Sequence, residues 1–341
     1  MAKPDFEAVG GQPFTRLGGG EIAADELLSN TPPKYLNDFK REIYLKAAGV
    51  WASRQADVVM RYARNASKEL SEIPLRPEAA KMPEIVAVPH FFRYDDPVSP
   101  EEMNWYLNFA DPVLFTAYDT DLFAQDEIQT LEHPLLAALK LHLDAMRCPE
   151  LRTLTVEGGR ATPWIFENVP RWINVNTSPV DKKGETKSIY GNAFASAARS
   201  LLRRAITVND NPLSRSNLIA MAAPCPGFGV YRPHEISQLV STVLAGFAPA
   251  VEAGAGRKTV IHTGRWGAGA FGGSEELALC VQIIGGMLCG VSKLVFHAVS
   301  PKCLENARRT AKTVVAASED AEQIVEKLLA CEYRWGFSDG N

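Results

Sequence analysis

The segment Ile261-His-Thr-Gly-Arg-Trp-Gly-Ala-Gly-Ala-Phe-Gly-Gly273 decides the fold expected for this chain. It follows a short apolar run at residues 258–262, which predicts a buried strand. It precedes residues 275–290, whose apolar side chains are spaced for one side of a helix, with Ser274 as the N-cap. Its five glycines let the backbone come close to an anion, which the free amides of a helix start would face. The pattern predicts a phosphate-binding loop, and a purely structural tight turn is the alternative.

Composition indicates an ordinary globular protein. The chain has 341 residues, of which 46% are hydrophobic, and a formal net charge of -4, which gives no basic field for nucleic acid. The six cysteines show no C-x-x-C spacing, so we expect reduced core residues. The first residues lack an apolar signal, and no uninterrupted apolar stretch is long enough to cross a bilayer. We expect a cytoplasmic protein with no nucleic-acid or membrane partner.

Hydrophobic periodicity predicts a helical N-terminal accessory region over residues 1–80 and an α/β body over residues 81–341. Within the first region we expect a loose segment at 1–20, helices at 25–28 and 35–70, and a proline-punctuated linker. The body alternates predicted strands with predicted helices, which indicates a three-layer α/β/α sandwich with ligands at the carboxyl ends of its strands. The predicted strands are 85–89, 151–156, 172–175, 218–222, 259–262 and 294–299. The predicted helices are 133–146, 192–206, 235–247, 275–288 and 307–317.

A second cluster, Gln125-Asp-Glu127, stands at the start of another predicted helix. Two adjacent acids in a first helical turn are commonly a solvated pair that answers the helix dipole. The chemical alternative is glycoside cleavage through an oxocarbenium-like state. In that chemistry one carboxyl protonates a leaving group at a sugar C1 while its neighbour holds a ribose hydroxyl.

Together the two clusters resemble the catalytic domain of the poly(ADP-ribose) glycohydrolases. That family carries Phe-Ala-Asn, a Gly-Gly-Gly loop, Gln-Glu-Glu and, much later, Thr-Gly-Asn-Trp-Gly-Cys-Gly-Ala-Phe-Gly-Gly. This chain has Phe109-Ala-Asp111, Gln125-Asp-Glu127 and Thr263-Gly-Arg-Trp-Gly-Ala-Gly-Ala-Phe-Gly-Gly273 in the same order and spacing. The resemblance covers residues 84–300. It implies a macrodomain with a mixed sheet, which would be the catalytic domain at 81–341, and ADP-ribosyl glycohydrolase activity.

The resemblance also implies roles for individual residues. Glu127 would be the general acid that protonates the departing group and then activates water, Asp126 would bind the ribose hydroxyls, and Gln125 would orient the pair. The glycine loop would wrap the pyrophosphate of ADP-ribose, with core packing as the alternative role of its two rings. The substrate-binding residues expected in this loop are Thr263, Gly264, Arg265, Trp266, Gly267, Ala268, Gly269, Ala270, Phe271 and Gly272.

Departures from the family pattern bear on the substrate. The family's Gly-Gly-Gly falls on Phe115-Thr-Ala117, so we expect single ADP-ribose units in preference to polymer. The family's asparagine in Phe-Ala-Asn is Asp111, which adds a negative charge near the cleaved bond. The family's adenine-stacking ring falls on Ala298, which leaves Phe296 or His297 as candidates for that contact.

Acidic residues on the expected leaving-group side predict a cationic attachment point. Asp111, Asp119, Asp121 and Asp126 lie close together in the sequence there, and Asp119 or Asp121 would hold a group such as the guanidinium of ADP-ribosylated arginine, with Asp111 as a further substrate-binding residue. Solvated turn positions are the alternative for Asp119 and Asp121. Bacterial relatives of the family include effectors that act on ADP-ribosylated ubiquitin, so ubiquitin is a candidate substrate by analogy. The expected partners are an ADP-ribosylated protein and ADP-ribose.

Three functions remain open from the sequence. A hydrolase of ADP-ribosyl linkages, on protein or on polymer, would depend on Glu127. A non-catalytic ADP-ribose reader would bind ADP-ribose without releasing it from a substrate. A nucleotide-dependent enzyme that shares only the glycine loop would prefer ATP or NAD. The histidines show no metal-binding spacing, and we expect neither a metal nor a cofactor.

Overall fold

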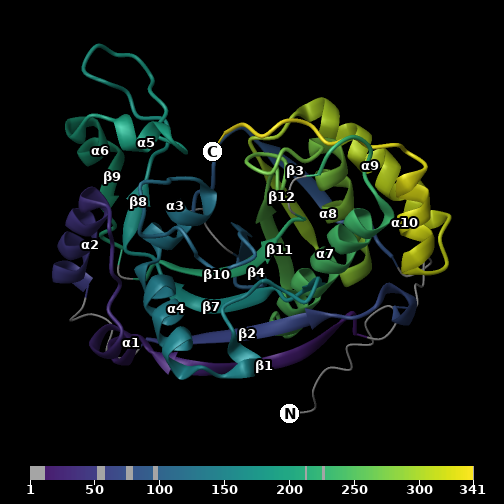
Figure 1. Cartoon of the computed structure of the whole chain (residues 1–341), viewed down its shortest axis with the longest axis horizontal. Coiled ribbons are helices and arrows are strands. Elements are labelled where there is room, and N and C mark those ends of the chain that lie inside the picture. Colours follow the sequence, from purple (N-terminus) through teal and green to yellow (C-terminus); the bar gives the residue numbers. More distant parts are fainter. Residues whose placement is uncertain are drawn as a thin grey trace.

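An eight-stranded mixed sheet forms the centre of the computed structural model (Figure 1). The structure describes residues 12–51, 58–73, 80–94, 99–211, 213–224 and 227–340, so Cys225 and the prolines at 74 and 77 lie outside the described residues. The strand order is β1-β2-β7-β10-β4-β11-β12-β3. These strands are β1 Phe14–Ala23, β2 Val59–Ser67, β3 Glu84–Val88, β4 Glu102–Ala110, β7 Trp164–Pro170, β10 Arg215–Ala222, β11 Lys258–Thr263 and β12 Lys293–His297.

The five strands from β10 to β3 are mutually parallel, whereas β1, β2 and β7 pair antiparallel with their neighbours. Two short ribbons stand apart from this sheet, one formed by β5 (Val156–Glu157) and β6 (Arg160–Ala161), the other by β8 (Ile173–Val175) and β9 (Ile206–Val208). The predicted strands at 85–89, 172–175, 218–222, 259–262 and 294–299 are confirmed. The sheet itself is mixed, as the macrodomain resemblance implies.

Helices cover both faces of the sheet (Figure 1). One face carries α1 Ala24–Asn30, α2 Asp38–Trp51, α3 Gln125–Glu132, α4 Pro134–Met146, α5 Ala193–Ser196 and α6 Arg199–Ala205. The other carries α7 Pro233–Ala253, α8 Glu275–Cys289, α9 Pro301–Ala316 and α10 Ala321–Leu329. Along β10, Leu218 and Ala220 join the core under the first set, while Ile219 and Met221 join the core under the second. This alternation builds the predicted three layers.

The N-terminal region is less helical than predicted. The predicted helix at 35–70 divides into α2 and the strand β2, and the predicted loose segment at 1–20 contains most of β1. Because almost every side chain of β2 is buried, its sequence lacks the alternation that marks a half-exposed strand. The division at residue 80 stays a prediction, but the main sheet contains strands from both sides of it.

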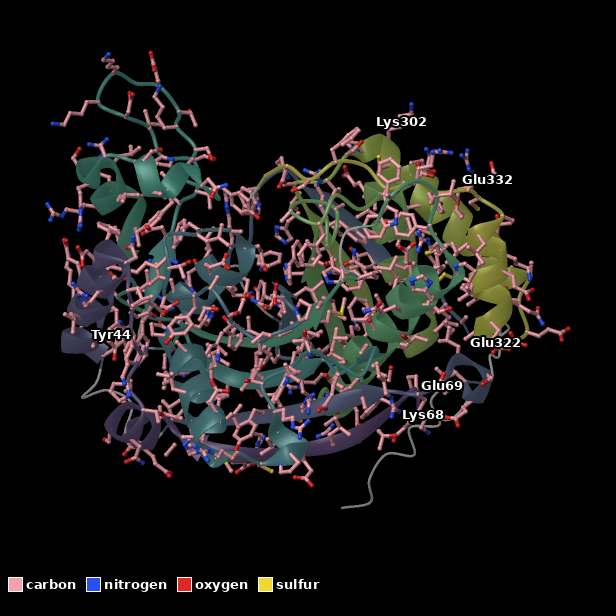
Figure 2. The ribbon with its side chains drawn as sticks, in the orientation of Figure 1. Tyr44, Lys68, Glu69, Lys302, Glu322 and Glu332 are labelled. Carbon is pink, nitrogen blue, oxygen red and sulfur yellow. The ribbon has the colours of Figure 1, made fainter. Side chains whose placement is uncertain are left out.

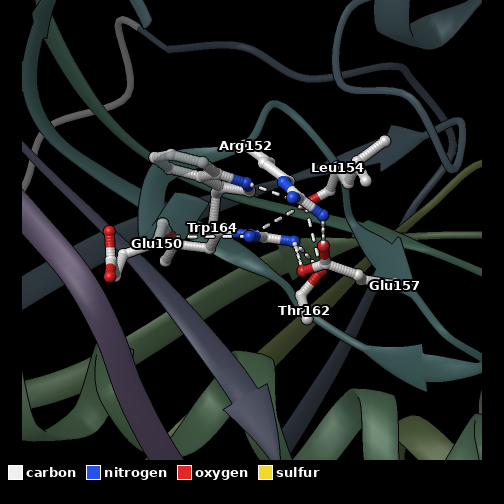
Figure 3. Close-up of polar contacts among 7 residues, drawn as sticks. Glu150, Arg152, Leu154, Glu157, Thr162 and Trp164 are labelled. Carbon is white, nitrogen blue, oxygen red and sulfur yellow. Dashed lines mark hydrogen bonds and ion pairs between the residues drawn. The ribbon is translucent and has the colours of Figure 1, made fainter. Parts of the chain in front are cut away.

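The segment after α4 is irregular because a buried arginine engages its carbonyl groups. Arg64 of β2 is fully buried, and its guanidinium donates to Leu154 O (3.2 Å), Glu150 O (3.4 Å), Glu157 Oε2 (3.0 Å) and Thr162 Oγ1 (3.0 Å). Figure 3 shows this cluster, in which Arg152 also contacts Glu157. The strand predicted at 151–156 is therefore wrong, and a 3-10 turn, η3 (Pro149–Leu151), begins this segment instead.

The helices on the second face include one that is long and apolar. By length and composition, α7 is long and apolar enough to cross a membrane, although the sequence analysis expects no stretch of that length. In the structure, 67% of its most apolar window is buried inside the protein. It packs on α8, α10 and the sheet. At the outer edge, α10 buries Ile324, Val325 and Leu328, while Glu322 and Lys302 of α9 point outward (Figure 2). The predicted helix at 192–206 is broken into α5 and α6.

Candidate active site

A cavity of about 460 Å³ lies at the carboxyl ends of the parallel strands. Because β4, β11 and β12 run parallel, the segments that follow Ala110, Thr263 and His297 meet at one edge of the sheet. The volume falls in the range of small-molecule sites. The structure brings both sequence clusters into this one cavity, where the predicted site residues in its lining are Asp111, Gln125, Asp126, Glu127, Thr263, Gly264, Arg265, Trp266, Gly267, Gly269, Ala270 and Phe271.

Four predicted site residues do not line the cavity. The side chain of Asp121 accepts a hydrogen bond from Asn37 Nδ2 (2.6 Å), and the carbonyl of Asp119 accepts the amides of Leu36 and Asn37 (3.0 and 2.8 Å). Both residues therefore contact the N-terminal segment and lie outside the cavity lining, so their contact with the substrate stays a prediction. Ala268 is 5% exposed and bonded within its loop, and Gly272 is covered by residues 337 and 338.

The side chain of Gln125 fixes the start of α3 to the end of β4. Its Oε1 accepts the amide of Phe109 (2.7 Å), and its Nε2 donates to Leu107 O (2.9 Å). The side-chain amide thus continues the hydrogen bonding of the strand edge. This contact agrees with an orienting role for Gln125, since the next two residues of the helix are the acidic pair.

Asp126 and Glu127 are both buried at the head of α3. Asp126 Oδ1 accepts from Asn108 Nδ2 (3.0 Å) and Thr130 Oγ1 (3.4 Å), which fixes its carboxyl group. Glu127 Oε2 accepts the amide of Ala124 (3.0 Å), so one of its oxygens caps the helix. The two carboxyls are 6% and 4% exposed, which rules out the solvated-pair alternative.

Burial raises the pKa of both carboxyl groups, and repulsion from neighbouring carboxylates adds to the rise. For Asp126, burial is the largest cause and the charge of Glu127 the next, and they raise its pKa to about 8. For Glu127, burial raises the pKa while hydrogen bonds and the charge of Lys40 oppose the rise. Asp111 adds repulsion to both. With a pKa of about 8, Asp126 retains its proton near neutral pH, and the raised pKa of Glu127 favours the protonated form that a general acid requires.

The raised pKa of the pair predicts a pH-dependent stability. A folded-state pKa above the unfolded value near 4 contributes stability below that value, which is lost as pH rises through the folded pKa. We expect the free energy of unfolding to decline from about pH 4 to about pH 8. Asp126→Asn should remove part of this decline and stabilise the protein at pH 8 by about 1–2 kcal/mol. Thermal unfolding at pH 5 and pH 8 measures the difference.

The control for this experiment is Glu69→Gln, which removes an exposed carboxylate (Figure 2). It should leave the difference in Tm between the two pH values unchanged. An Asp126→Asn protein with the same pH dependence as the wild type would contradict the buried-pair explanation.

The glycine loop turns back on itself and presents amides to the cavity. Internal bonds join the amide of Ala268 to Arg265 O, Gly272 to Gly269 O and Gly273 to Gly267 O, each at 2.9 Å. Within the described part of the chain, four other amides between residues 267 and 271 form no backbone hydrogen bond, and all four residues line the cavity. They are Gly267, Gly269, Ala270 and Phe271. Such a group of free amides before a helix is suited to binding an anion.

The side chains of the loop hold it in place. Thr263 Oγ1 donates to Gln282 Oε1, and Gln282 Nε2 donates to Gly264 O (3.1 Å), which ties the loop to α8. Trp266 is 1% exposed and donates from Nε1 to Met221 O (3.0 Å). The indole therefore packs in the core beneath the loop, while an edge of the residue reaches the cavity. Ser274 caps α8 by accepting the amide of Leu277 (3.3 Å), as predicted.

Aromatic rings that the sequence analysis did not select line the rest of the cavity. Phe91 stacks on Tyr190 with ring centroids 5.7 Å apart and an interplanar angle of 14°. Of the two candidates for the adenine contact, His297 lines the cavity, whereas Phe296 is fully buried in the core. The sequence shows aromatic residues at 91 and 92, but only the fold places Phe91 against Tyr190 and Phe92 against His297.

The two buried strand histidines are hydrogen-bonded to each other. His262 Nδ1 lies 3.0 Å from His297 Nε2, and His297 Nδ1 contacts His90 O at the same distance. Burial, with a smaller effect from His297, lowers the pKa of His262 to about 3, so His262 is neutral. Among the described residues, no group of three or more His, Cys, Asp or Glu side chains is arranged to hold a metal ion.

The C-terminal segment 335–340 crosses the glycine loop (Figure 1). The amide of Gly336 donates to Gly272 O (2.8 Å), and that of Asp339 donates to Gly269 O (3.4 Å). Beyond these contacts, Asn192 at the start of α5 donates to Gly340 O. Asp339 itself lines the cavity, which places a carboxylate beside the free amides.

The segment that replaces the family's Gly-Gly-Gly has a backbone suited to glycine. Phe115 has a positive φ of 51°, a conformation that bulky residues rarely adopt. Its ring is buried and packs against Phe166 (5.7 Å between centroids). Residues 115–117 do not line the cavity, so their side chains do not fill it.

Comparison with known proteins agrees with this geometry. Residues 186–306, which include the glycine loop, match the family described as Poly (ADP-ribose) glycohydrolase (PARG), Macro domain fold. Within these residues the chain is similar to the macrodomain of that family. The acidic pair lies outside the matched segment, and the cavity joins it to the matched glycine loop. A search of curated protein sequences found no match to the PARG-like chain.

Solved structures similar to this PARG-like chain include bacterial PARG enzymes. The enzyme from Thermomonospora curvata is 12% identical, covers 81% of this chain and 100% of its own, and has a TM-score of 0.44. The same enzyme bound to the inhibitor ADP-HPD is 16% identical, with 80% and 98% covered and a TM-score of 0.43. The enzyme from Deinococcus radiodurans in complex with ADP-ribose is 12% identical, with 86% and 98% covered and a TM-score of 0.38.

Proposed function

We propose that the chain is a hydrolase that releases ADP-ribose from modified proteins by cleaving the bond at the anomeric carbon of the ribose. One observation carries the proposal: a single cavity joins four free backbone amides of the glycine loop to a buried pair of carboxyl groups. The amides suit a diphosphate, and the carboxyls suit acid and base chemistry at a sugar. ADP-ribose has both groups in one molecule.

In the first step, Glu127 acts as the general acid. The bond between the anomeric carbon and the leaving atom breaks, its electron pair goes to the leaving atom, and that atom takes the proton of Glu127. Burial raises the pKa of Glu127, which favours the protonated form that this step requires. Asp126, whose carboxyl group is fixed by Asn108, holds the ribose hydroxyls.

In the second step, Glu127 acts as the general base. It accepts a proton from a water molecule, whose oxygen bonds to the anomeric carbon and gives free ADP-ribose. The two steps balance in protons, because Glu127 donates one proton in the first step and accepts one in the second. No cofactor is needed for this reaction.

We propose single ADP-ribose units as the preferred substrate over polymer. Two features support this preference. The segment at 115–117 has lost the glycines that the family places there and contributes nothing to the cavity lining. The C-terminal segment spans from the glycine loop to Asn192, which restricts the room for a chain that continues beyond one unit.

For the attachment point we propose a cationic side chain, with arginine as the first candidate. Asp119 and Asp121 lie outside the cavity lining, so this proposal does not rest on them. Asp111 lines the cavity and lies close enough to the acidic pair to raise the pKa of both members. A guanidinium beside Asp111 would offset that repulsion. Modified ubiquitin stays a candidate substrate by analogy with bacterial relatives.

A panel of substrates tests this proposal. The purified protein is given arginine-linked, serine-linked and polymeric ADP-ribose, and free ADP-ribose is measured. We expect release from the arginine-linked protein to exceed release from polymer by about tenfold or more, a difference in transition-state binding of about 1.4 kcal/mol. Asp111→Asn should reduce the arginine preference. Cleavage of polymer alone would overturn the substrate assignment.

The second candidate is a non-catalytic reader of ADP-ribosylated proteins. The loss of the family's glycines at 115–117 favours it, because the ribose then lacks one of the backbone surfaces that the family provides. Calorimetry with ADP-ribose, ATP and NAD, followed by the release assay, separates the functions. A reader binds ADP-ribose and releases none, whereas tighter binding of ATP or NAD would indicate a nucleotide-dependent enzyme.

A further inference from the structure

A fully buried lysine from the N-terminal region lies behind the acidic pair. Lys40, in the first turn of α2, is 0% exposed. Its ammonium donates to Tyr118 O (3.0 Å) and Leu122 O (2.7 Å) and lies over the rings of Phe123 (5.6 Å) and Phe194 (5.8 Å). A lysine side chain is almost never fully buried unless its ammonium group is paired, because the charge is costly to desolvate.

The contacts of Lys40 fix the segment that leads into α3. Tyr118 and Leu122 are the two ends of one turn, and both of their carbonyls bond to the same ammonium. The chain then passes from Leu122 to Ala124, whose amide binds Glu127 Oε2. A displacement of this turn would therefore move the carboxyl group of Glu127. The family resemblance places flexible glycines at the start of this segment, where this chain has larger residues.

The charge of Lys40 acts on the same carboxyls. Four carboxylates face it, Glu127 foremost, followed by Asp119, Asp121 and Asp126. Burial lowers the pKa of Lys40 to about 8, and these carboxylates limit the decrease. In return, Lys40 opposes the rise in the pKa of Glu127 that burial produces, while Asp111 reinforces that rise. Within the described residues, no carboxylate oxygen pairs with Lys40 within 4 Å, so the effect is electrostatic at longer range.

We propose that Lys40 is a positioning residue of the active site, which fixes the 118–122 turn and supplies the positive charge that balances the buried acidic pair. It acts through the turn and through Glu127, since it does not line the cavity. The role in the reaction rests on the proposed function. The electrostatic coupling between Lys40 and Glu127 does not depend on the proposed function.

The test compares Lys40→Met with Lys40→Arg and with Arg64→Met. Lys40→Met keeps the length of the side chain but removes its positive charge and its hydrogen-bond donors. Lys40→Arg keeps the positive charge and the donors. Arg64 is a second fully buried cation from the N-terminal region that faces neither carboxyl of the pair, so Arg64→Met controls for stability loss alone.

Lys40→Met should lower kcat for ADP-ribose release at pH 7 by about tenfold, with the Kd for ADP-ribose within about threefold. Loss of the positive charge raises the pKa of Glu127, so the alkaline limb of the kcat profile should move to higher pH by about half a unit or more. Lys40→Arg should restore the wild-type limb. Arg64→Met should lower the Tm without moving the limb. A Lys40→Met protein that loses Tm but keeps its limb would overturn the proposal.

A double-mutant cycle of Lys40→Met and Glu127→Gln, measured by Tm, tests the coupling without an activity assay. At pH 8, Lys40→Met should lower the Tm less in the Glu127→Gln background than in the wild type, because the charge that Lys40 balances is absent there. Additive losses would reject the coupling. If the wild type releases no ADP-ribose, the proposed function fails while this cycle still decides the role of Lys40. Lys40→Gln replaces Lys40→Met in both measurements if the latter does not fold, and the same outcomes apply.

Discussion

Glu127→Gln is expected to slow ADP-ribose release by at least about a thousandfold while leaving the Kd for ADP-ribose within about threefold of the wild type. The amide cannot donate a proton to the leaving group or accept one from water. Its oxygen still accepts the amide of Ala124, so the helix start is preserved. Release kinetics and calorimetry on the same preparation measure both quantities.

The matched control is Glu235→Gln. Glu235 is a buried glutamate at the third position of α7, and its Oε2 accepts the amide of Arg232 (2.6 Å) in the way that Glu127 accepts that of Ala124. It does not line the cavity, so release should stay near the wild-type rate. Full activity of Glu127→Gln would assign the acid to another residue. Loss of binding together with release would reduce Glu127 to a structural role.

Gly267→Val is expected to weaken ADP-ribose binding by about a hundredfold or more. Gly267 has a φ of 74°, which side chains rarely adopt, and a Cβ there would lie 2.5 Å from the Cβ of Ala223. The loop must move to accept valine, and the free amides at 267 and 269–271 then lose their shared orientation. Two lost hydrogen bonds to a charged group correspond to about 3 kcal/mol or more, which is about a hundredfold in Kd.

Gly290→Ala is the control for backbone strain at this loop. Gly290 ends α8 with the same φ of 74°, but nothing lies within 4 Å of its added Cβ. Alanine there should cost about 1 kcal/mol of stability and leave ADP-ribose binding unchanged. Calorimetric titration of both variants is the measurement. If Gly267→Val folds and binds ADP-ribose as the wild type does, the diphosphate does not bind to this loop.

The parallel strands β3, β10, β11 and β12 were predictable from the sequence, whereas the central parallel strand β4 and the antiparallel strands β1, β2 and β7 were not predicted. Strands β11 and β12 are short, fully buried apolar runs with turn residues on both sides, so local pattern was enough. In β1, Gly19 allows close approach, since a Cβ there would lie 2.6 Å from Tyr62 O in β2. From the sequence alone, the glycines of this segment predict a loose segment and not a strand.

The two ends of the site were predictable, but the residues that connect and support them were not. The glycine loop and Gln125-Asp-Glu127 are contiguous motifs, so their residue types could be recognised in order. Lys40, Tyr190 and Asp339 reach the site through contacts between distant segments. No local pattern distinguishes Lys40 from an exposed lysine of an amphipathic helix. For the same reason, the sequence does not show that Asp119 and Asp121 lie outside the cavity lining.

A crystal structure of the Glu127→Gln protein with ADP-ribose tests the central claim most directly. The diphosphate should lie within hydrogen-bond distance, about 2.7–3.2 Å, of amides among Gly267, Gly269, Ala270 and Phe271. The anomeric carbon should lie beside residue 127, with a ribose hydroxyl at Asp126. A diphosphate bound away from the glycine loop, or an anomeric carbon turned away from the acidic pair, would contradict the account.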